Sequence, residues 1–361
     1  MLSYRKLAMR VLGRPLHTGG IDSPRPASQR AAAFILTAVM LTTLAAPAFA
    51  GTWSIENGDI TVKAGETGND VTQNNVTTKN DTDTIITNSD KDTASSHTVT
   101  IETNDKNDKV EVTLDNVNIK ADSGSALTSK GDVTLTLKGD NSLTGGNGGS
   151  GISSSSGVTV SDGTVTANGG NGGNVSGDGI RSDGGVTISG GTVTANGGNS
   201  TNSSGGYGII SLDVAISSGT VTANGGDSKD GYGGDGIHSN GVTISGGTVN
   251  AAGGYGGKVG GYGICSFDRV AISGGTVEAA GGNGSTGGGS GIYSSVIDLS
   301  GSLELTAKAG SPNGKALSQR GNELELDTIK DKLGPGAKVT ATDADGKVID
   351  QAVSYTHLTL P

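Results

Sequence analysis

The stretch GVTISGGTVTANGG, residues 185–198, decides the fold of this 361-residue chain, because near copies of it recur at a fixed distance. GVTVSDGTVTANGG occupies 157–170 and GVTISGGTVNAAGG occupies 241–254. A repeat of fixed length is the signature of a chain built from stacked structural units. The valine of the Gly-Thr-Val phrase steps by 28 residues through five copies: Val165, Val193, Val221, Val249 and Val277.

Each copy contains three short runs of β-branched residues. In the quoted stretch these are the run through Val186 and Ile188 and the run around Val193, and a Gly-Ile-x-Ser phrase at 179–182 precedes them. Apolar residues alternate with Thr or Ser, so one face of each run points inward and the other outward. Since no copy has enough apolar residues for a core of its own, the pattern predicts an all-β fold, a right-handed parallel β-helix (solenoid) with coils of about 28 residues and three short strands.

Glycine marks the corners of the predicted coil. Turns between short strands need positive φ, which glycine adopts without steric cost. The chain has 65 glycines but no Gly-X-Y period and only seven prolines, which excludes collagen. The regular recurrence of Val and Ile argues against plain disorder.

The repeat also predicts the domain boundaries. We expect the parallel β-helix to span 110–345, where the alternation of apolar and polar residues is sustained. Residues 51–109 are expected to form an amino-terminal cap or irregular first coils, because a solenoid must not leave an open apolar end. Residues 346–361 are expected to be a tail, and their abrupt change of composition at VSYTHLTLP favours a truncated or artefactual end.

Residues 1–50 have the order of a secretory signal peptide. A basic region precedes the apolar run AAAFILTAVMLTTLAA, which ends at Ala48-Phe49-Ala50. We therefore expect a secreted, extracellular bacterial protein that is not inserted in the membrane after cleavage. Residues 1–50 hold six of the 25 Lys and Arg and one of the 35 Asp and Glu, which leaves 19 basic and 34 acidic residues. Such an acidic chain repels nucleic acid.

In a solenoid, function is sought along columns of equivalent residues. The serine two positions after each Gly-Ile is expected to point inward as a structural ladder, with Ser153 as its first member. The residues two positions before and one position after the isoleucine are expected to point outward. Along both columns, coils with Asp and Arg or His alternate with coils carrying tyrosine. The residues singled out there as carbohydrate-binding candidates are Asp178, Arg181, Tyr207, Asp235, His238, Tyr262 and Tyr293.

Tyrosine rings beside carboxylates suit sugars, because the ring stacks on C–H faces and the acid accepts hydrogen bonds from hydroxyls. The alternative is that tandem duplication copied solvated edge residues with no ligand. Catalysis requires an irregular cluster of acid, base and metal ligands, and none interrupts 157–291, so we expect no catalytic residue and no enzyme. No cofactor is required, but calcium binding remains open, with Asp213 and Asp268 as candidate metal ligands.

The phrases VEVTLDNVNI, ALTSKGDVTLTLKGDNSLTGG and the repeated GVTISGGTVTANGG together resemble secreted bacterial β-helix proteins described as carbohydrate-binding domain-containing. The resemblance covers about 110–300. It implies binding of polysaccharide, including pectic polysaccharide, without cleavage, calcium binding, and association with the cell wall or cell surface. The alternatives are an adhesin-like stalk or spacer without its own ligand, and a polysaccharide lyase or hydrolase.

Overall fold

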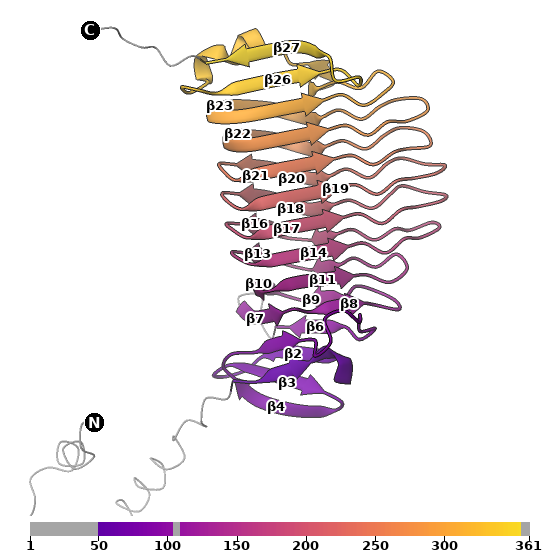
Figure 1. Ribbon diagram of the computed structural model, residues 1–361, viewed down its shortest axis with the longest axis vertical. Helices are drawn as coiled ribbons and strands as arrows, with labels where there is room; N and C mark the ends of the chain where they lie inside the picture. The colour runs from indigo at the N-terminus through magenta and orange to yellow at the C-terminus, as the bar shows by residue number, and fades with distance from the viewer. Residues whose placement is uncertain (1–49, 104–108, 355–361) are drawn as a thin grey trace, which may run out of the picture. The chain divides into compact units, whose positions relative to one another are not determined.

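The computed structural model describes residues 50–103 and 109–354, and over this range the chain forms a parallel β-solenoid of about eight turns with about 28 residues per turn (Figure 1). The expected fold class and coil length are therefore confirmed. Each of these turns adds one strand, or one segment of a longer strand, to each of three parallel sheets, and the irregular coils at the two ends add further strands. These sheets are named sheet 1, sheet 2 and sheet 3 in the order in which the chain of one turn passes through them.

Sheet 1 contains the Gly-Ile-x-Ser phrase. Its strands are β2 (Ile60–Ala64), β6 (Val99–Glu102), β9 (Leu127–Ser129), β12 (Ile152–Ser154), β15 (Ile180–Ser182), the first parts of β18 (Ile209–Ile216), β20 (Ile237–Ile244), β22 (Ile264–Ala280) and β23 (Ile292–Lys308), and β24 (Leu317–Gln319).

Sheets 2 and 3 contain the two runs of the quoted stretch. Sheet 2 comprises β1 (Thr52–Ser54), β5 (Ile85–Thr87), β7 (Lys109–Asp115), β10 (Asp132–Lys138), β13 (Val158–Val160), β16 (Gly185–Ile188) and the next parts of β18, β20, β22 and β23. Sheet 3 comprises β8 (Asn118–Lys120), β11 (Asp140–Thr144), β14 (Thr164–Asn168), β17 (Thr192–Asn196), β19 (Thr220–Asn224), β21 (Thr248–Ala252), the last parts of β22 and β23, and β26 (Lys338–Thr342).

In the later coils one continuous strand runs through two or three of the sheets, whereas three separate short strands per coil were expected. β18 and β20 run through sheets 1 and 2, and β22 and β23 run through all three sheets. The reason is that the corner residues keep their pairing with the next coil, as Gly275 does with Leu303. At that corner Gly275 has φ of 81°, which turns the chain without ending the ladder.

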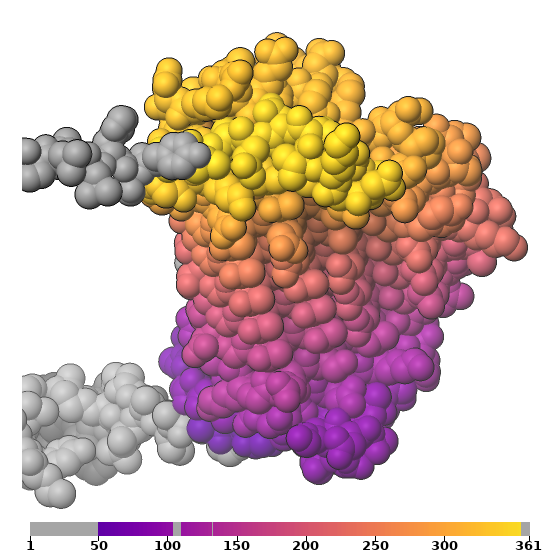
Figure 2. Space-filling view, turned by 45° about the horizontal axis from the view of Figure 1, so that its top comes forward, coloured from indigo at the N-terminus to yellow at the C-terminus, as the bar shows by residue number. Residues whose placement is uncertain are grey.

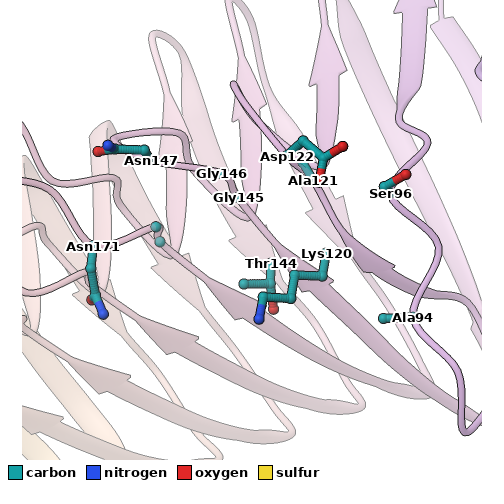
Figure 3. Close-up of a pocket in the computed structure, with 12 residues that line it drawn as sticks. Ala94, Ser96, Lys120, Ala121, Asp122, Thr144, Gly145, Gly146, Asn147 and Asn171 are labelled. Carbon is teal, nitrogen blue, oxygen red and sulfur yellow. The ribbon is translucent and has the colours of Figure 1, made fainter.

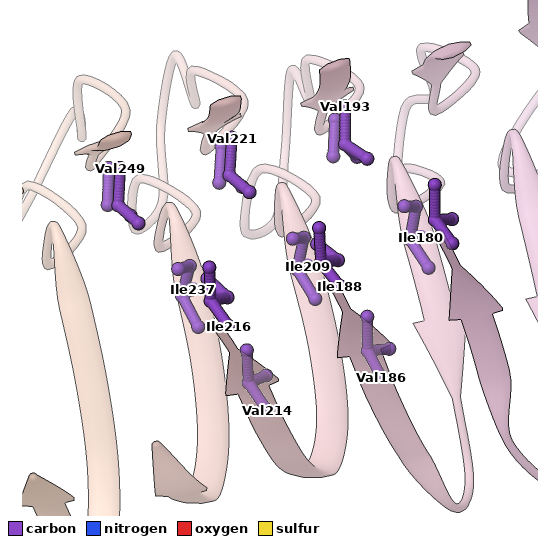
Figure 4. Packing of buried hydrophobic residues seen from close by; sticks show 14 of the residues in the cluster. Ile180, Val186, Ile188, Val193, Ile209, Val214, Ile216, Val221, Ile237 and Val249 are labelled. Carbon is purple, nitrogen blue, oxygen red and sulfur yellow. The ribbon is translucent and has the colours of Figure 1, made fainter. Parts of the chain in front are cut away.

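The core is a set of stacked apolar columns between the three sheets, and Figure 4 shows equivalent side chains pointing inward coil after coil. Ile180, Ile209 and Ile237 form one column from sheet 1, and Val193 and Val221 belong to the Gly-Thr-Val column of sheet 3; all five are 0 % exposed. The parallel register joins residues 28 apart, so each coil buries the same positions and no coil needs a core of its own.

The serine column of sheet 1 points inward, as expected, but in the coil of β12 its member is Ser154 rather than Ser153, and it begins one coil earlier at the buried Ser129. The register pairs Ser154 with Ser182 and Ser153 with Arg181, so Ser153 lies on the outward face. The buried hydroxyls donate to main-chain carbonyls at the corner between sheets 1 and 2. The hydroxyl of Ser239, for example, lies within hydrogen-bond distance of two of them, Leu212 O at 2.9 Å and Gly241 O at 2.8 Å, and its one proton serves both. The column is structural.

The variable segments between sheet 3 and sheet 1 project from one edge of the stack as a row of loops (Figure 1). They also stack on one another in parallel, with bridges that link Gly172, Ser200, Ser228 and Gly256. The side chain of Asn199 accepts the N–H of Asp227 at 2.8 Å, and Asp227 accepts the N–H of Tyr255 at 2.7 Å. The loops are therefore held by the same coil-to-coil pairing as the strands.

Antiparallel strands cover both ends of the stack. At the amino-terminal end, β3 (Asn69–Gln73) pairs with β2 and with β4 (Val76–Asp81), while β2, β5 and β6 already pair in parallel with later coils. Residues 51–109 thus include both a cap and the first coils. At the other end, β27 (Val348–Val353) pairs with β26, and Figure 2 shows these residues lying over the last coil. The remaining elements are β25 (Asn322–Glu323) and the 3-10 helices η1 (Ile55–Asn57) and η2 (Leu326–Lys332).

The folded stack extends through Val353, beyond the boundary at 345 that the composition suggested. Most of the expected signal peptide, residues 1–49, lies outside the described residues, and so do residues 355–361 at the other end. Within the described residues, no helix has both the length and the apolar character needed to span a lipid bilayer.

Candidate ligand-binding face

The outward face of sheet 1 brings the predicted site residues together. The strand register places Arg181, Ile210, His238, Cys265 and Tyr293 in one column. Three residues earlier in each coil lies a second column, joined by main-chain hydrogen bonds such as Gly208 N–H to Asp235 O: Asp178, Tyr207, Asp235, Tyr262 and Ser290.

The two carboxylates of this face are buried rather than exposed as expected. Asp178 is 7 % exposed and Asp235 is 6 % exposed. Each uses Oδ1 to accept the main-chain N–H of the tyrosine in the next coil: Tyr207 N lies 2.8 Å from Asp178, and Tyr262 N lies 2.7 Å from Asp235. Both carboxylates therefore brace the loop that enters the next coil.

Each carboxylate also pairs through Oδ2 with the residue three positions later. Arg181 Nη1 lies 3.4 Å from Asp178, and His238 Nδ1 lies 2.7 Å from Asp235. Burial raises the pKa of Asp178 above its usual value, although the Tyr207 N–H and Arg181 oppose that shift. The two copies of the site thus share one scaffold and differ in the partner of the carboxylate.

The aromatic rings stack on one another along the solenoid axis. Tyr207 stacks on His238 with ring centroids 4.5 Å apart, and Tyr262 stacks on Tyr293 at 5.0 Å. One face of each of these rings is consequently covered by its partner. Burial, followed by the negative charges of Asp235 and Asp178, raises the pKa of Tyr207 to about 12.

A groove of about 330 Å³ crosses this face over four coils. Its lining includes the exposed apolar side chains of Leu212 and Phe267, with 51 % and 59 % of their surface accessible. The Phe267 ring meets the edge of His238 with centroids 5.1 Å apart and planes at 82°. The groove is lined by Arg181, Ser182, Asp183, Ile210, Ser211, Leu212, His238, Ser239, Asn240 and Phe267.

The predicted residues therefore have different positions in the site. Arg181 and His238 line the groove, and Tyr207 packs on His238, while Asp178 and Asp235 are buried beside their partners. Tyr262 and Tyr293 form a separate pair that does not line the groove. Sequence reasoning missed Leu212, Phe267 and Cys265, although the alternation of the column after the ladder serine (Asp183, Leu212, Asn240, Phe267) was a signal for the first two.

The two candidate calcium ligands, Asp213 and Asp268, are both exposed. They do not occupy equivalent positions, because an irregularity between Ser266 and Arg269 puts Arg269, not Asp268, in register with Gly241 and hence with Asp213. Calcium binding there stays a prediction. Among the described residues, the side chains that gather as potential metal ligands are those of Asp235, His238 and Cys265, whose ligand atoms all lie within 4.8 Å of one another.

A second hollow, of about 820 Å³, lies near the base of the loops at the amino-terminal coils; Figure 3 shows Lys120 beside Thr144, with Asn147 and Asn171 to one side of this pair. Its other polar side chains are Ser96 and Asp122, and glycine backbone forms much of the rest. None of its lining residues is aromatic, so it offers hydrogen bonds but no ring for a sugar to stack on.

Comparisons with known protein families, with curated proteins and with solved structures found no match for this chain.

Proposed function

We propose that this protein is a secreted, non-catalytic polysaccharide-binding β-solenoid that holds its ligand in the groove on the outward face of sheet 1. The observation that carries the proposal is the exposed ring of Phe267, which lines the groove together with Leu212 and with polar side chains such as Asn240. An exposed aromatic ring offers the C–H face of a sugar a stacking surface.

The polar side chains of the groove supply hydrogen bonds for hydroxyl groups. Arg181 donates, Asp183 accepts, and Asn240 does both. The groove extends from the coil of Arg181 to the coil of Phe267, three steps of about 4.8 Å or about 14 Å along the solenoid axis. That length accommodates a short segment of an extended chain, which suits a polysaccharide better than a single sugar.

The proposal moves the ligand from the tyrosines to the neighbouring column. Tyr207 and His238 cover each other's ring faces, so they stabilise the floor of the groove, and Phe267 takes the stacking role. Calcium and a pectic ligand belong to the proposal through the resemblance described above. Location at the bacterial surface rests on that resemblance and on residues 1–50.

Affinity electrophoresis tests the proposal. The protein is run in native gels containing pectin, xylan or glucan, with and without calcium, and retardation is expected in at least one gel. Phe267→Ala should abolish the retardation, whereas Tyr232→Ala, which removes an aromatic ring 54 % exposed in the loops, should leave it unchanged. Retardation that survives Phe267→Ala would overturn the assignment of the groove.

The stacked loops and continuous core also favour a second candidate, a rigid stalk or spacer. A stalk without its own ligand predicts no retardation in any gel. A reducing-sugar assay and an unsaturated-uronate absorbance assay on the same polysaccharides test hydrolysis and elimination. Product formation in either assay would contradict the non-catalytic proposal.

A further inference from the structure

We propose that Asp235, His238 and Cys265 form a binding site for one divalent transition-metal ion, with zinc as the best match. Asp235 lies in the loop that enters β20, His238 lies on β20, and Cys265 lies on β22 in the next coil. Their ligand atoms all fall within 4.8 Å of one another. Carboxylate, imidazole and thiolate form a donor set that suits zinc, whereas calcium takes oxygen ligands.

The protein contains an internal comparison for this site. Two coils earlier, Asp178 has the same burial, accepts the N–H of the next tyrosine in the same way and also pairs with the residue three positions later. There the partner is Arg181, and the position equivalent to Cys265 is occupied by Ile210.

The two copies of this arrangement therefore differ at both positions other than the carboxylate, and both differences favour metal binding in the second copy. In the first copy the buried carboxylate has a permanent positive partner, and the third position has no donor atom. In the second copy both positions carry metal ligands. A metal site confined to the second copy requires the same buried carboxylate in both copies and metal ligands at the other two positions of the second copy alone. The two copies differ in this way, which argues that the cluster is not a chance meeting of polar groups.

The local hydrogen bonds orient Asp235 for metal binding. Its Oδ1 is engaged by the Tyr262 N–H, which leaves Oδ2 directed at His238 Nδ1, 2.7 Å away. An ion with bonds of about 2.0 Å in tetrahedral geometry separates its nitrogen and oxygen ligands by about 3.3 Å. A small rotation of the imidazole supplies that difference. The flanking rings of Tyr207 and Phe267 keep the imidazole on this face.

Metal binding must displace the thiol proton of Cys265. Burial raises the pKa of this thiol, and the negative charge of Asp235 raises it further. In the metal-free protein the thiol is therefore protonated. When the ion binds, the thiol proton leaves to solvent. The proton that joins His238 Nδ1 to Asp235 Oδ2 in the metal-free pair also leaves Nδ1, so the neutral imidazole carries its single proton on Nε2 while Nδ1 faces the metal. One thiolate, one carboxylate and a neutral imidazole balance the charge of a divalent cation, and water completes the coordination.

Cobalt substitution of the full chain tests the site. Titration with Co²⁺ should give thiolate-to-cobalt charge-transfer absorption in the near ultraviolet that saturates at one ion per chain, and Zn²⁺ should abolish it. Cys265→Ser should remove the absorption, and His238→Gln should weaken binding at least tenfold. Circular dichroism establishes that both variants are folded. Absence of the absorption from the folded parent protein, or its persistence in Cys265→Ser, would overturn the proposal.

His97 provides a matched control. Its Nδ1 lies 3.5 Å from Asp59 in an exposed pair, and neither residue belongs to the Asp235–His238–Cys265 group. His97→Gln should leave the cobalt absorption and the stoichiometry unchanged. A loss of binding in His97→Gln would place the metal elsewhere and contradict the assignment.

The first copy provides a gain-of-function test. The double substitution Arg181→His and Ile210→Cys gives the Asp178 scaffold the same donor set as the second copy. The stoichiometry should rise from one ion to two per chain. A folded double variant that still binds one ion would contradict the claim that these three positions are sufficient. None of these measurements depends on a polysaccharide, so the metal site and the proposed function are tested separately.

Discussion

The ring of Tyr207 lies on the imidazole of His238, with centroids 4.5 Å apart and planes 27° from parallel, although 31 positions separate the two residues in the chain. The contact joins the two outward columns of sheet 1, because Tyr207 comes from one column and His238 from the next coil of the other. The same diagonal step joins Tyr262 to Tyr293. The alternation of acidic and tyrosine coils therefore also determines which rings stack between neighbouring coils.

The two partly buried tyrosines predict a loss of stability at alkaline pH. Burial is the main reason that the pKa values of Tyr207 and Tyr262 are raised to about 12 from 10.0. A phenol whose pKa is raised by folding contributes stability that is complete below pH 10 and disappears as the pH rises through 12. The free energy of unfolding, measured with denaturant from pH 9 to 12, should fall across this range.

The double substitution Tyr207→Phe and Tyr262→Phe should flatten that decline, because neither phenyl ring can ionise. Tyr232→Phe and Tyr255→Phe, which alter exposed loop residues, serve as the control pair. An unchanged slope in the first double variant would show that these two phenols do not cause the decline.

The buried carboxylate of Asp178 predicts a change of stability in the acidic pH range. Its folded-state pKa is raised above 3.8, mainly by burial, so the ionised carboxylate is less favourable in the folded protein than in the unfolded chain. The contribution of Asp178 to stability is complete below pH 3.8 and is lost as the pH rises through the folded-state pKa. Asp178→Asn should therefore become progressively more stable relative to the parent protein as the pH rises from 3.5 to 7.

Asp183→Asn is the control for this comparison, since the side chain of Asp183 is 64 % exposed. Denaturant unfolding at several pH values gives the difference in free energy for each variant. A constant difference for Asp178→Asn across the acidic range would show that burial does not dominate at this carboxylate.

The solenoid could be predicted from the sequence because each coil repeats the same pattern of apolar, polar and glycine residues. A step of 28 residues and an alternation of period two together determine the parallel register and the inward columns, as with Val193 and Val221. The fused strands were not predictable in this way. Gly274 and Gly275 resemble turn residues in sequence, and only the coil beside them shows that they remain paired.

The sequence predicted which residues share the candidate face, but it did not predict which of them are buried. Sequence spacing placed Asp178 and Arg181 on one face, but it did not show that Tyr207 would donate its main-chain N–H to the carboxylate or that the carboxylate would be buried. Cys265 was passed over because a single cysteine has no partner in sequence. Its neighbours Asp235 and His238 become visible only when adjacent coils are laid side by side.

The inward and outward faces of sheet 1 predict a large contrast between two adjacent isoleucines. Ile209 is 0 % exposed in the core, whereas Ile210 is only partly buried on the outward face. Ile209→Ala should lower the free energy of unfolding by about 2–5 kcal/mol through lost burial and a residual cavity. Ile210→Ala should cost clearly less, and similar losses for the two variants would contradict the assigned register.

The corner between sheets 2 and 3 predicts a position where glycine cannot be replaced. Gly219 has φ of 84°, and a Cβ built on it would lie 2.6 Å from the carbonyl oxygen of Gly191 in the preceding coil. Gly219→Ala must therefore both strain its own backbone, at about 1–3 kcal/mol, and push two coils apart. Gly185→Ala is the matched control, because its Cβ would come no closer than 3.6 Å to Asp213 O.

Thermal and denaturant unfolding of these two variants, measured beside the parent protein, should show a clear loss of stability for Gly219→Ala. Gly185→Ala should stay within about 0.5 kcal/mol of the parent, because surface substitutions without a clash usually do. Equal stability of the two variants would mean that the corner accepts a side chain. The recurrence of glycine at positions 163, 191, 219, 247 and 275 would then need a cause other than the geometry of the turn.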